Sequence, residues 1–186
     1  MLSMPRLRLI AGEVLRRFQN LALYRKLGRR LAASVMIREA TDADKADVRR
    51  WLNPQGDPTP LRNPGVTEWV EYRRGQLAGF VQLVRHPPEH FPYTGHWLFG
   101  LAVKSCYQGF GIGETLSLAV IARSCEEGAP AVSLLVDDDN ARAIRLYRKL
   151  GFDFCVIPEL ETQLERERKP SGSRRVVMRK PLAGPE

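Results

Sequence analysis

Two hydrophobic periods follow one another along this chain, and the change between them divides it into two parts. Residues 7–32 place apolar side chains at three- and four-residue steps with arginines between them, which predicts an amphipathic helix. From residue 35 onward, short apolar runs alternate with helical stripes and with turns rich in glycine and proline. The pattern predicts an α/β (α+β) domain over residues 36–186 behind a basic helical extension over residues 1–35.

The elements of this domain are expected where the apolar runs and their boundary residues agree. Strands are expected at residues 35–38, 67–72, 76–85, 97–103, 131–136, 152–157 and 175–179. Helices are expected at residues 41–52, 111–127 and 140–150. Thr41 and Asp44 resemble a capping box at the start of the first helix. Residues 53–65 and 86–95 are rich in proline and are expected to be loops, and the charged residues 159–173 are expected to be a mobile connection.

The positive charge is concentrated at the N-terminus. The net charge is +8, but residues 1–35 carry eight basic side chains against one acid, so the rest of the chain is close to neutral. The domain itself is therefore not expected to bind a specific nucleic acid. The helix at residues 7–32 is expected to pack on its own domain or on a partner subunit. Contact with a membrane surface or a polyanion, and a targeting role, stay as alternatives.

Hydropathy and cysteine usage exclude several classes of protein. No run approaches eighteen apolar residues, so a membrane-spanning helix is not expected. Cys106, Cys125 and Cys155 are odd in number and form no Cys-x-x-Cys pair, which argues against a zinc site and against a disulfide framework. A cytoplasmic protein with reduced thiols and no metal is expected.

The stretch 101–113 carries the clearest chemical signal. An apolar strand runs into a glycine-rich turn, and a helix begins at once. Such a turn directs several backbone N–H groups, together with the positive end of a helix dipole, into one space, where they bind phosphate. Gly113 is followed by Glu114 and Thr115, so the turn fits neither a P-loop nor the Gly-x-Gly-x-x-Gly of a dinucleotide-binding fold.

The turn has the pattern Gln-x-x-Gly-x-Gly from Gln108, and a second pattern, Asn-x-x-Ala-x-x-x-Tyr-x-x-x-Gly-Phe, follows the next strand from Asn140. Their order, spacing and expected elements resemble the two acetyl-CoA motifs of the GNAT superfamily of N-acetyltransferases. The resemblance covers residues 36–181 in layout, with specific motifs only in the middle. One departure is Ser105, where a proline is common in the family.

The resemblance implies a GNAT fold, a mixed and twisted sheet flanked by helices, whose parallel fourth and fifth strands (residues 97–103 and 131–136) splay apart. It implies acetyl-CoA as co-substrate, with the pantetheine arm pairing with the backbone of Leu101 and Val103 and Arg148 near the adenosine phosphate. The implied cofactor-binding residues are Leu101, Ala102, Val103, Gln108, Gly109, Phe110, Gly111, Ile112, Gly113, Glu114, Thr115, Asn140, Tyr147 and Arg148.

The family mostly uses direct attack of a neutral amine on the thioester, and Tyr147 aligns with its usual acid. The base is harder to assign, because residues 133–136 contain no acid. His96 is the candidate, since an imidazole titrates near neutral pH. Other options are water-mediated deprotonation and the side chains of Glu68, Glu71, His86 and His90.

The predicted function is an acetyl-CoA-dependent N-acyltransferase that moves an acetyl group onto a primary amine of a small molecule or onto a protein amino group. The alternative is a non-catalytic acyl-CoA-binding module that docks through its N-terminal helix. The loops at residues 53–65 and 86–95 are expected to select the acceptor, and assembly as a homodimer stays open.

Overall fold

The computed structural model describes residues 36–55 and 64–182. The helix predicted at residues 7–32 lies outside these ranges. Within them, no helix is long and apolar enough to cross a membrane.

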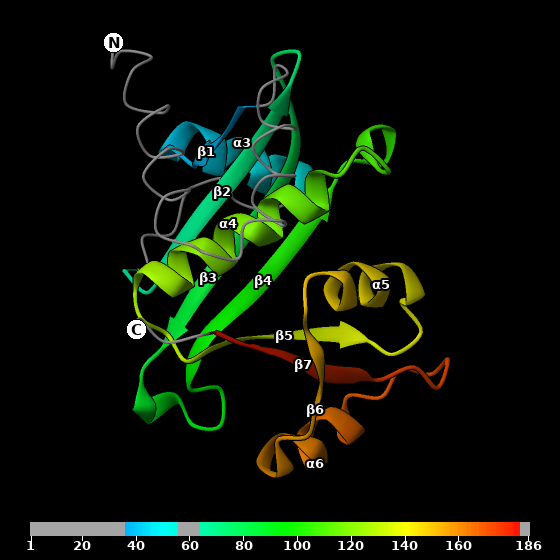
Figure 1. The fold of residues 1–186 in the computed structure, drawn as a ribbon. Coiled ribbons are helices and arrows are strands. Elements are labelled where there is room, and N and C mark those ends of the chain that lie inside the picture. Colours follow the sequence, from blue (N-terminus) through cyan, green and yellow to red (C-terminus); the bar gives the residue numbers. More distant parts are fainter. Residues whose placement is uncertain (1–35, 56–63, 183–186) are drawn as a thin grey trace.

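In the described part of the chain, one mixed sheet of seven strands forms the centre of the domain (Figure 1). The strands are β1 (Met36–Glu39), β2 (Val66–Arg73), β3 (Gln76–His86), β4 (Gly95–Val103), β5 (Ala131–Asp137), β6 (Asp153–Cys155) and β7 (Arg175–Pro181). Their order in the sheet is β1-β2-β3-β4-β5-β7-β6. The β4–β5 pair is parallel and every other pair is antiparallel. This confirms the predicted mixed α/β sheet and its strands.

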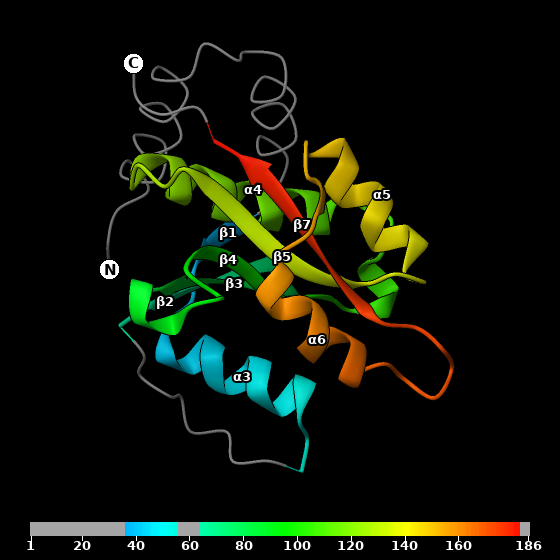
Figure 2. The ribbon, with the colours of Figure 1, turned by 90° about the horizontal axis from the view of Figure 1, so that it is seen from below.

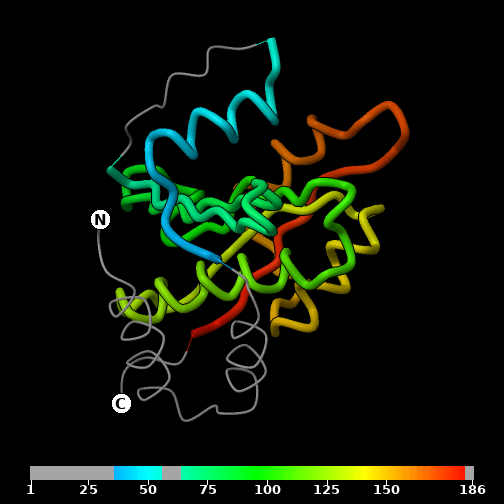
Figure 3. Tube along the Cα trace, turned by 90° about the horizontal axis from the view of Figure 1, so that it is seen from above, coloured from blue at the N-terminus to red at the C-terminus, as the bar shows by residue number. Residues whose placement is uncertain are grey.

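Four α-helices in the described ranges cover the sheet, two on each face. They are α3 (Asp42–Leu52), α4 (Ile112–Glu126), α5 (Ala141–Lys149) and α6 (Pro158–Arg166), with short 3-10 turns at Pro88–His90 and Ser105–Tyr107. Figures 2 and 3 show α4 and α5 on one side of the strands and α3 and α6 on the other. The largest hydrophobic cluster lies beneath α4 and α5, and two smaller clusters lie beneath α3 and α6.

The local signals at the start of the domain are confirmed. The Thr41 side chain accepts from the N–H of Asp44, whose carboxylate accepts in turn from the Thr41 N–H, so the predicted capping box begins α3. Arg74 and Gly75 both have positive φ, 48° and 74°, and connect β2 to β3. Two positive-φ residues match the twist of the flanking strands, which is why this sequence forms a tight hairpin.

The prediction of a mobile connection over residues 159–173 was wrong. Pro158 lies in the first turn of α6, and Leu160 and Leu164 are fully buried on one side of it. They pack with Trp97 of β4 and Val177 of β7. The polar residues between and after the two leucines concealed this stripe in the sequence, because a short helix needs only one apolar pair at a four-residue spacing to reach the core.

The parallel strands diverge as predicted. Only two residue pairs join β4 to β5, His96 with Val132 and Trp97 with Ser133, after which the two strands separate (Figure 1). The β3–β4 register shifts by one residue at this level, and Gly100 in β4 has a φ of 61°. An extra residue bends a strand and increases its twist, and glycine adopts this conformation without the cost of a side chain. The bulge thus turns β4 away from β5 and opens a fork above Trp97.

Candidate active site

The edge of β4 that faces the fork is formed by backbone groups of Leu101 and Val103. The N–H of Lys104 donates to the carbonyl of Ala78 in β3 over 2.9 Å. Backbone groups alternate sides along an antiparallel strand, so Ala102 also faces β3, whereas Leu101 and Val103 face the diverging β5. In agreement, the Val103 carbonyl accepts from Gln108 Nε2 at 3.2 Å rather than from β3. From Leu98 to Val103, this edge of β4 pairs with no strand in the described part of the chain.

The glycine turn leads directly from this edge into α4. Gly109 and Gly111 have φ of 89° and 81°, a conformation that side chains rarely adopt, and Gly111 is the N-cap of the helix. The side chains of Ile112 and Thr115 are buried, and the Thr115 hydroxyl donates to the Gly111 carbonyl over 3.1 Å. The N–H of Thr115 also donates to the Gly111 carbonyl, over 3.0 Å. The turn therefore offers the backbone N–H groups that precede Thr115, those of Ile112 and Gly113, which the first turn of a helix leaves unpaired and which attract anions. Phe110 projects into solvent between the two glycines.

One side of α5 faces this turn. Arg142 donates to Gln108 Oε1, Leu146 lies 3.2 Å from the position that a Cβ of Gly113 would occupy, and Lys149 pairs with Glu114 at 2.6 Å. Arg142, Leu146 and Lys149 are spaced by four and three residues, so they share one helix face. The sequence interpretation missed Arg142 and Lys149, although this spacing could have indicated them.

Arg148 points elsewhere. Its guanidinium lies 5.1 Å from the centroid of the exposed Phe154 ring, next to β6. The basic side chains of α5 that contact the turn and the first turn of α4 are thus Arg142 and Lys149. The assignment of Arg148 to the adenosine phosphate stays a prediction.

Asn140 lies at the N-terminal end of α5, and Tyr147 lies in its last turn. The Asn140 side-chain oxygen accepts from the N–H of Ala143 over 3.1 Å and caps the helix. Tyr147 is 6% exposed, and its ring meets the edge of Phe152 at 5.8 Å between centroids. Burial raises the pKa of the Tyr147 phenol to about 12. The phenol is therefore neutral at physiological pH and keeps a proton that it can donate.

His96 lies at the closed end of the fork. Its Nε2 is 3.7 Å from Glu127, directly after α4, and its Nδ1 is buried with no hydrogen-bond partner among the described residues. Burial lowers its pKa, partly opposed by Glu127. Tyr147 lies near the other end of α4, whose fifteen residues span about 20 Å. The structure does not bring the predicted acid and the predicted base together.

The remaining candidate bases lie in different surroundings. Glu71 is fully buried beside Arg73, 2.8 Å away, and burial raises its pKa. His86, the last residue of β3, and His90 of the following 3-10 turn contact each other through their Nδ1 atoms at 3.2 Å. Glu68 lies on β2, opposite Gln82, whose Nε2 donates to it over 2.7 Å.

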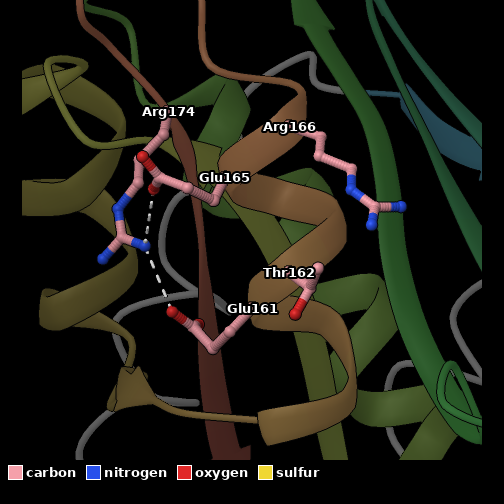
Figure 4. Close-up of a pocket in the computed structure, with 5 residues that line it drawn as sticks. All are labelled: Glu161, Thr162, Glu165, Arg166 and Arg174. Carbon is pink, nitrogen blue, oxygen red and sulfur yellow. Dashed lines mark hydrogen bonds and ion pairs between the residues drawn. The ribbon is translucent and has the colours of Figure 1, made fainter.

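A separate hollow opens beside α6 (Figure 4). Arg174 reaches Glu161 at 3.1 Å and Glu165 at 3.6 Å across it, while Thr162 and Arg166 project from another side of the helix. The fork contributes no residue to this hollow. In the described ranges, no group of three or more His, Cys, Asp or Glu side chains could hold a metal ion.

The comparisons with known proteins agree with this geometry. The model of the acetyltransferase (GNAT) family matches residues 29–152, more than half of the chain. The chain belongs to the GNAT family. This GNAT chain is 30% identical over 168 residues to a mycothiol acetyltransferase of Frankia alni, covering 82% of this chain and 46% of that protein. It is 33% identical over 118 residues to the mycothiol acetyltransferase of Paenarthrobacter aurescens, covering 63% of this chain and 32% of that protein. It thus spans less than half the length of these relatives.

Solved structures share the fold along nearly their whole length. The ribosomal-protein-S18-alanine N-acetyltransferase of Escherichia coli aligns with a TM-score of 0.61 at 21% identity, covering 81% of this chain and 96% of that one. An acetyltransferase of Bacillus subtilis in complex with CoA aligns with a TM-score of 0.59 at 20% identity, covering 80% and 98%. At these identities the likeness establishes the GNAT fold of the chain.

Proposed function

We propose that this protein is an N-acetyltransferase that moves an acetyl group from acetyl-CoA onto a primary amine. The observation that carries the proposal is the fork, where the open edge of β4 leads directly into the glycine turn and the N-terminus of α4. The solved neighbour from Bacillus subtilis contains CoA, and another, from Bacillus anthracis, contains acetyl-CoA, which supports the same donor here.

The residues present fit this donor. The backbone of Leu101 and Val103 offers strand-like pairing to the pantetheine amides, because β5 has left that edge. The N–H groups after Gly111 suit the pyrophosphate, with Arg142 and Lys149 adding positive charge from α5. When bound, acetyl-CoA supplies the activated acyl group as a thioester.

The protein contributes polarisation of the thioester carbonyl and a proton for the leaving thiolate. Backbone N–H groups at the β4 edge are fixed dipoles beside which a carbonyl oxygen can develop negative charge. Tyr147 of α5 is a neutral phenol and is the group we assign to protonate a departing thiolate. His96 remains a candidate base, although it lies beside Glu127 at the other end of α4.

The test is thiol release from acetyl-CoA with a panel of amines and peptides. Tyr147→Phe should lower the rate by about tenfold or more while acetyl-CoA affinity is retained, the signature of a group that acts in the transition state. Tyr72→Phe, which removes a phenol on the other face of the sheet, is the matched control. Acetyl-CoA binding without release on any acceptor would favour the non-catalytic binding module. Failure to bind acetyl-CoA would refute the interpretation of the glycine turn.

A further inference from the structure

The two faces of the sheet differ at the fork. The glycine turn packs with α4 and α5 on one face, where Leu101 and Val103 also direct their side chains against Gly113. The phosphates of a CoA donor therefore belong to that face. An acceptor needs access to the fork from the opposite face, which α3 and α6 only partly cover (Figures 2 and 3).

On that opposite face, a row of three side chains crosses the sheet between the two helices. The register pairs Glu68 of β2 with Gln82 of β3, and Gln82 with Phe99 of β4. The next row towards the open end includes Val70 and Phe80, which pack beneath α3. On the other side of the row lies Trp97, which packs beneath α6. Neither helix cluster includes the row Glu68–Gln82–Phe99.

This row lies at the level where β4 and β5 separate. Their last pair is Trp97 with Ser133, two residues before Phe99, and the bulge at Gly100 follows. Gln82 Oε1 is 3.4 Å from the position that a Cβ of Gly100 would occupy, so the amide touches the bulge. Gln82 is therefore the one side chain of the row that contacts both the bulge at the fork and the Glu68 carboxylate.

The Glu68 carboxylate accepts one hydrogen bond and already lies beside one cation. Gln82 Nε2 donates to Oε1 at 2.7 Å, and Lys45 of α3 lies 3.4 Å from Oε2. Its side chain is only 10% exposed, so its position is restrained. A carboxylate has about four lone-pair directions, so two contacts leave room for a further donor. Phe99, at the other end of the row, is 50% exposed, and the face of its ring attracts an ammonium group.

We propose that Glu68 binds the ammonium group of the acceptor and takes its proton, and that Phe99 contacts the same cation. The inference rests on the proposed function and defines its substrate class as amines that are protonated in solution. The carboxylate removes one proton from R–NH3⁺. The neutral nitrogen then forms a bond to the thioester carbonyl carbon, the C–S bond breaks with its electron pair on sulfur, and the thiolate is protonated. The second proton leaves the nitrogen, giving the N-acetyl amide and CoA thiol.

Lys45 is the charged group that faces Glu68 from α3, while Gln82 and Phe99 are its neutral neighbours across the sheet. A substrate ammonium shares the carboxylate with Lys45 rather than replacing Gln82. Lys45→Met should therefore strengthen the apparent binding of the amine, because one competing cation is removed, and should not affect acetyl-CoA.

The experiment uses the full-length protein and compares its activity on two acceptors of the same shape. One is the best amine of the panel, which is an ammonium ion at pH 7, and the other is its O-alkylhydroxylamine analogue, whose nitrogen is neutral at that pH. Glu68→Gln keeps the acceptor atom for Gln82 and removes the charge. It should lower kcat/KM about a hundredfold or more for the ammonium acceptor and by less than about tenfold for the neutral one, with acetyl-CoA affinity unchanged. Glu68→Asp should restore part of the loss, and Glu126→Gln, on the exposed side of α4, is the matched control.

Several outcomes would overturn the inference. An equal loss on both acceptors would mean that Glu68 only supports the fold, and no loss would exclude it from the site. A selective loss in His96→Gln but not in Glu68→Gln would assign the base to His96. If Glu68→Gln does not fold, Phe99→Leu decides, because it should raise KM for the ammonium acceptor alone. Wild-type protein that binds acetyl-CoA but acetylates neither acceptor would overturn the proposed function, and this inference with it.

Discussion

The phenol of Tyr72 donates a hydrogen bond of 2.6 Å to the carboxylate of Asp44, which joins the end of β2 to the first turn of α3. The same carboxylate accepts from Arg38 Nη2 of β1 at 2.8 Å and from the N–H of Thr41 at 2.7 Å. Asp44 is 3% exposed, so its charge is almost entirely removed from water. Burial alone would raise the pKa of its carboxyl, but the hydrogen bonds from Arg38, Thr41 and Tyr72 outweigh burial and hold it well below its usual range.

We expect Asp44→Asn to lower the free energy of unfolding by about 2–4 kcal/mol at pH 7, because it leaves Arg38 without its buried partner. Tyr72→Phe should cost about 1 kcal/mol, the value of one hydrogen bond. Urea unfolding measures both, and Asp47→Asn, on the exposed side of the same helix, is the control with an effect near zero. The Asp44 contribution is present above the pKa of the unfolded carboxyl and should be lost as the pH falls through the lowered folded value. A stability difference between wild type and Asp44→Asn that does not shrink in acid would contradict this account.

Glu71 has the opposite environment and should have the opposite pH dependence. It is fully buried on β2, and its Oε2 has no hydrogen-bond partner among the described residues. Burial raises its pKa, although Arg73 opposes the shift. The folded state then binds more protons than the unfolded state at pH values between the two pKa values, so stability falls as the pH rises through this window.

Glu71→Gln should therefore stabilise the protein at pH 7.5 by about 1 kcal/mol, the lower end of the cost of an unsatisfied buried polar group. The gain should be smaller at pH 4.5. Urea unfolding of both proteins at the two pH values gives the comparison. A larger gain at the lower pH would mean that Arg73 compensates the carboxylate fully.

Two arginines of α5, Arg142 and Arg148, are candidates for contacting CoA, and substitution of each shows which one contributes. Arg142 donates to Gln108, which in turn donates to the Val103 carbonyl, whereas Arg148 lies over Phe154. Arg142→Ala should weaken acetyl-CoA binding about tenfold, because charge-assisted hydrogen bonds are the stronger class. Arg148→Ala should change it by less than about twofold, as for other exposed charges. Titration calorimetry measures both, and a larger effect of Arg148 would support its assignment to the adenosine phosphate over the role expected for Arg142.

The contribution of α6 can be measured with a matched pair on the same helix. Leu164 is fully buried against the cluster of Trp97 and Val177, so Leu164→Ala should cost about 2–5 kcal/mol of unfolding free energy. Thr162→Ala, at an exposed position of this helix, should change stability by less than about 0.5 kcal/mol. Equal effects of the two substitutions would show that α6 does not pack as the structure has it.

The sequence determined the elements whose signals are local. The capping box at Thr41, the hairpin at Arg74–Gly75 and the glycine turn at Gly109–Gly113 depend on residues within a few positions of one another, and all three formed as expected. The family motifs added the mixed sheet with its parallel β4–β5 pair. Local rules failed at α6, where the burial of Leu160 and Leu164 depends on Trp97, a contact more than sixty residues away along the chain.

The arrangement of the site depended on tertiary structure alone. Sequence spacing could not show that Arg148 turns to Phe154, that His96 lies beside Glu127, or that Glu68 joins Gln82 and Phe99 at the bulge. Each of these relations depends on strand register and helix rotation, which are fixed when long-range packing selects one buried face. A one-residue shift in register would move Glu68 to the other face of the sheet. The sequence therefore determined which chemistry the chain carries, and the packing of the sheet decided which side chains meet to perform it.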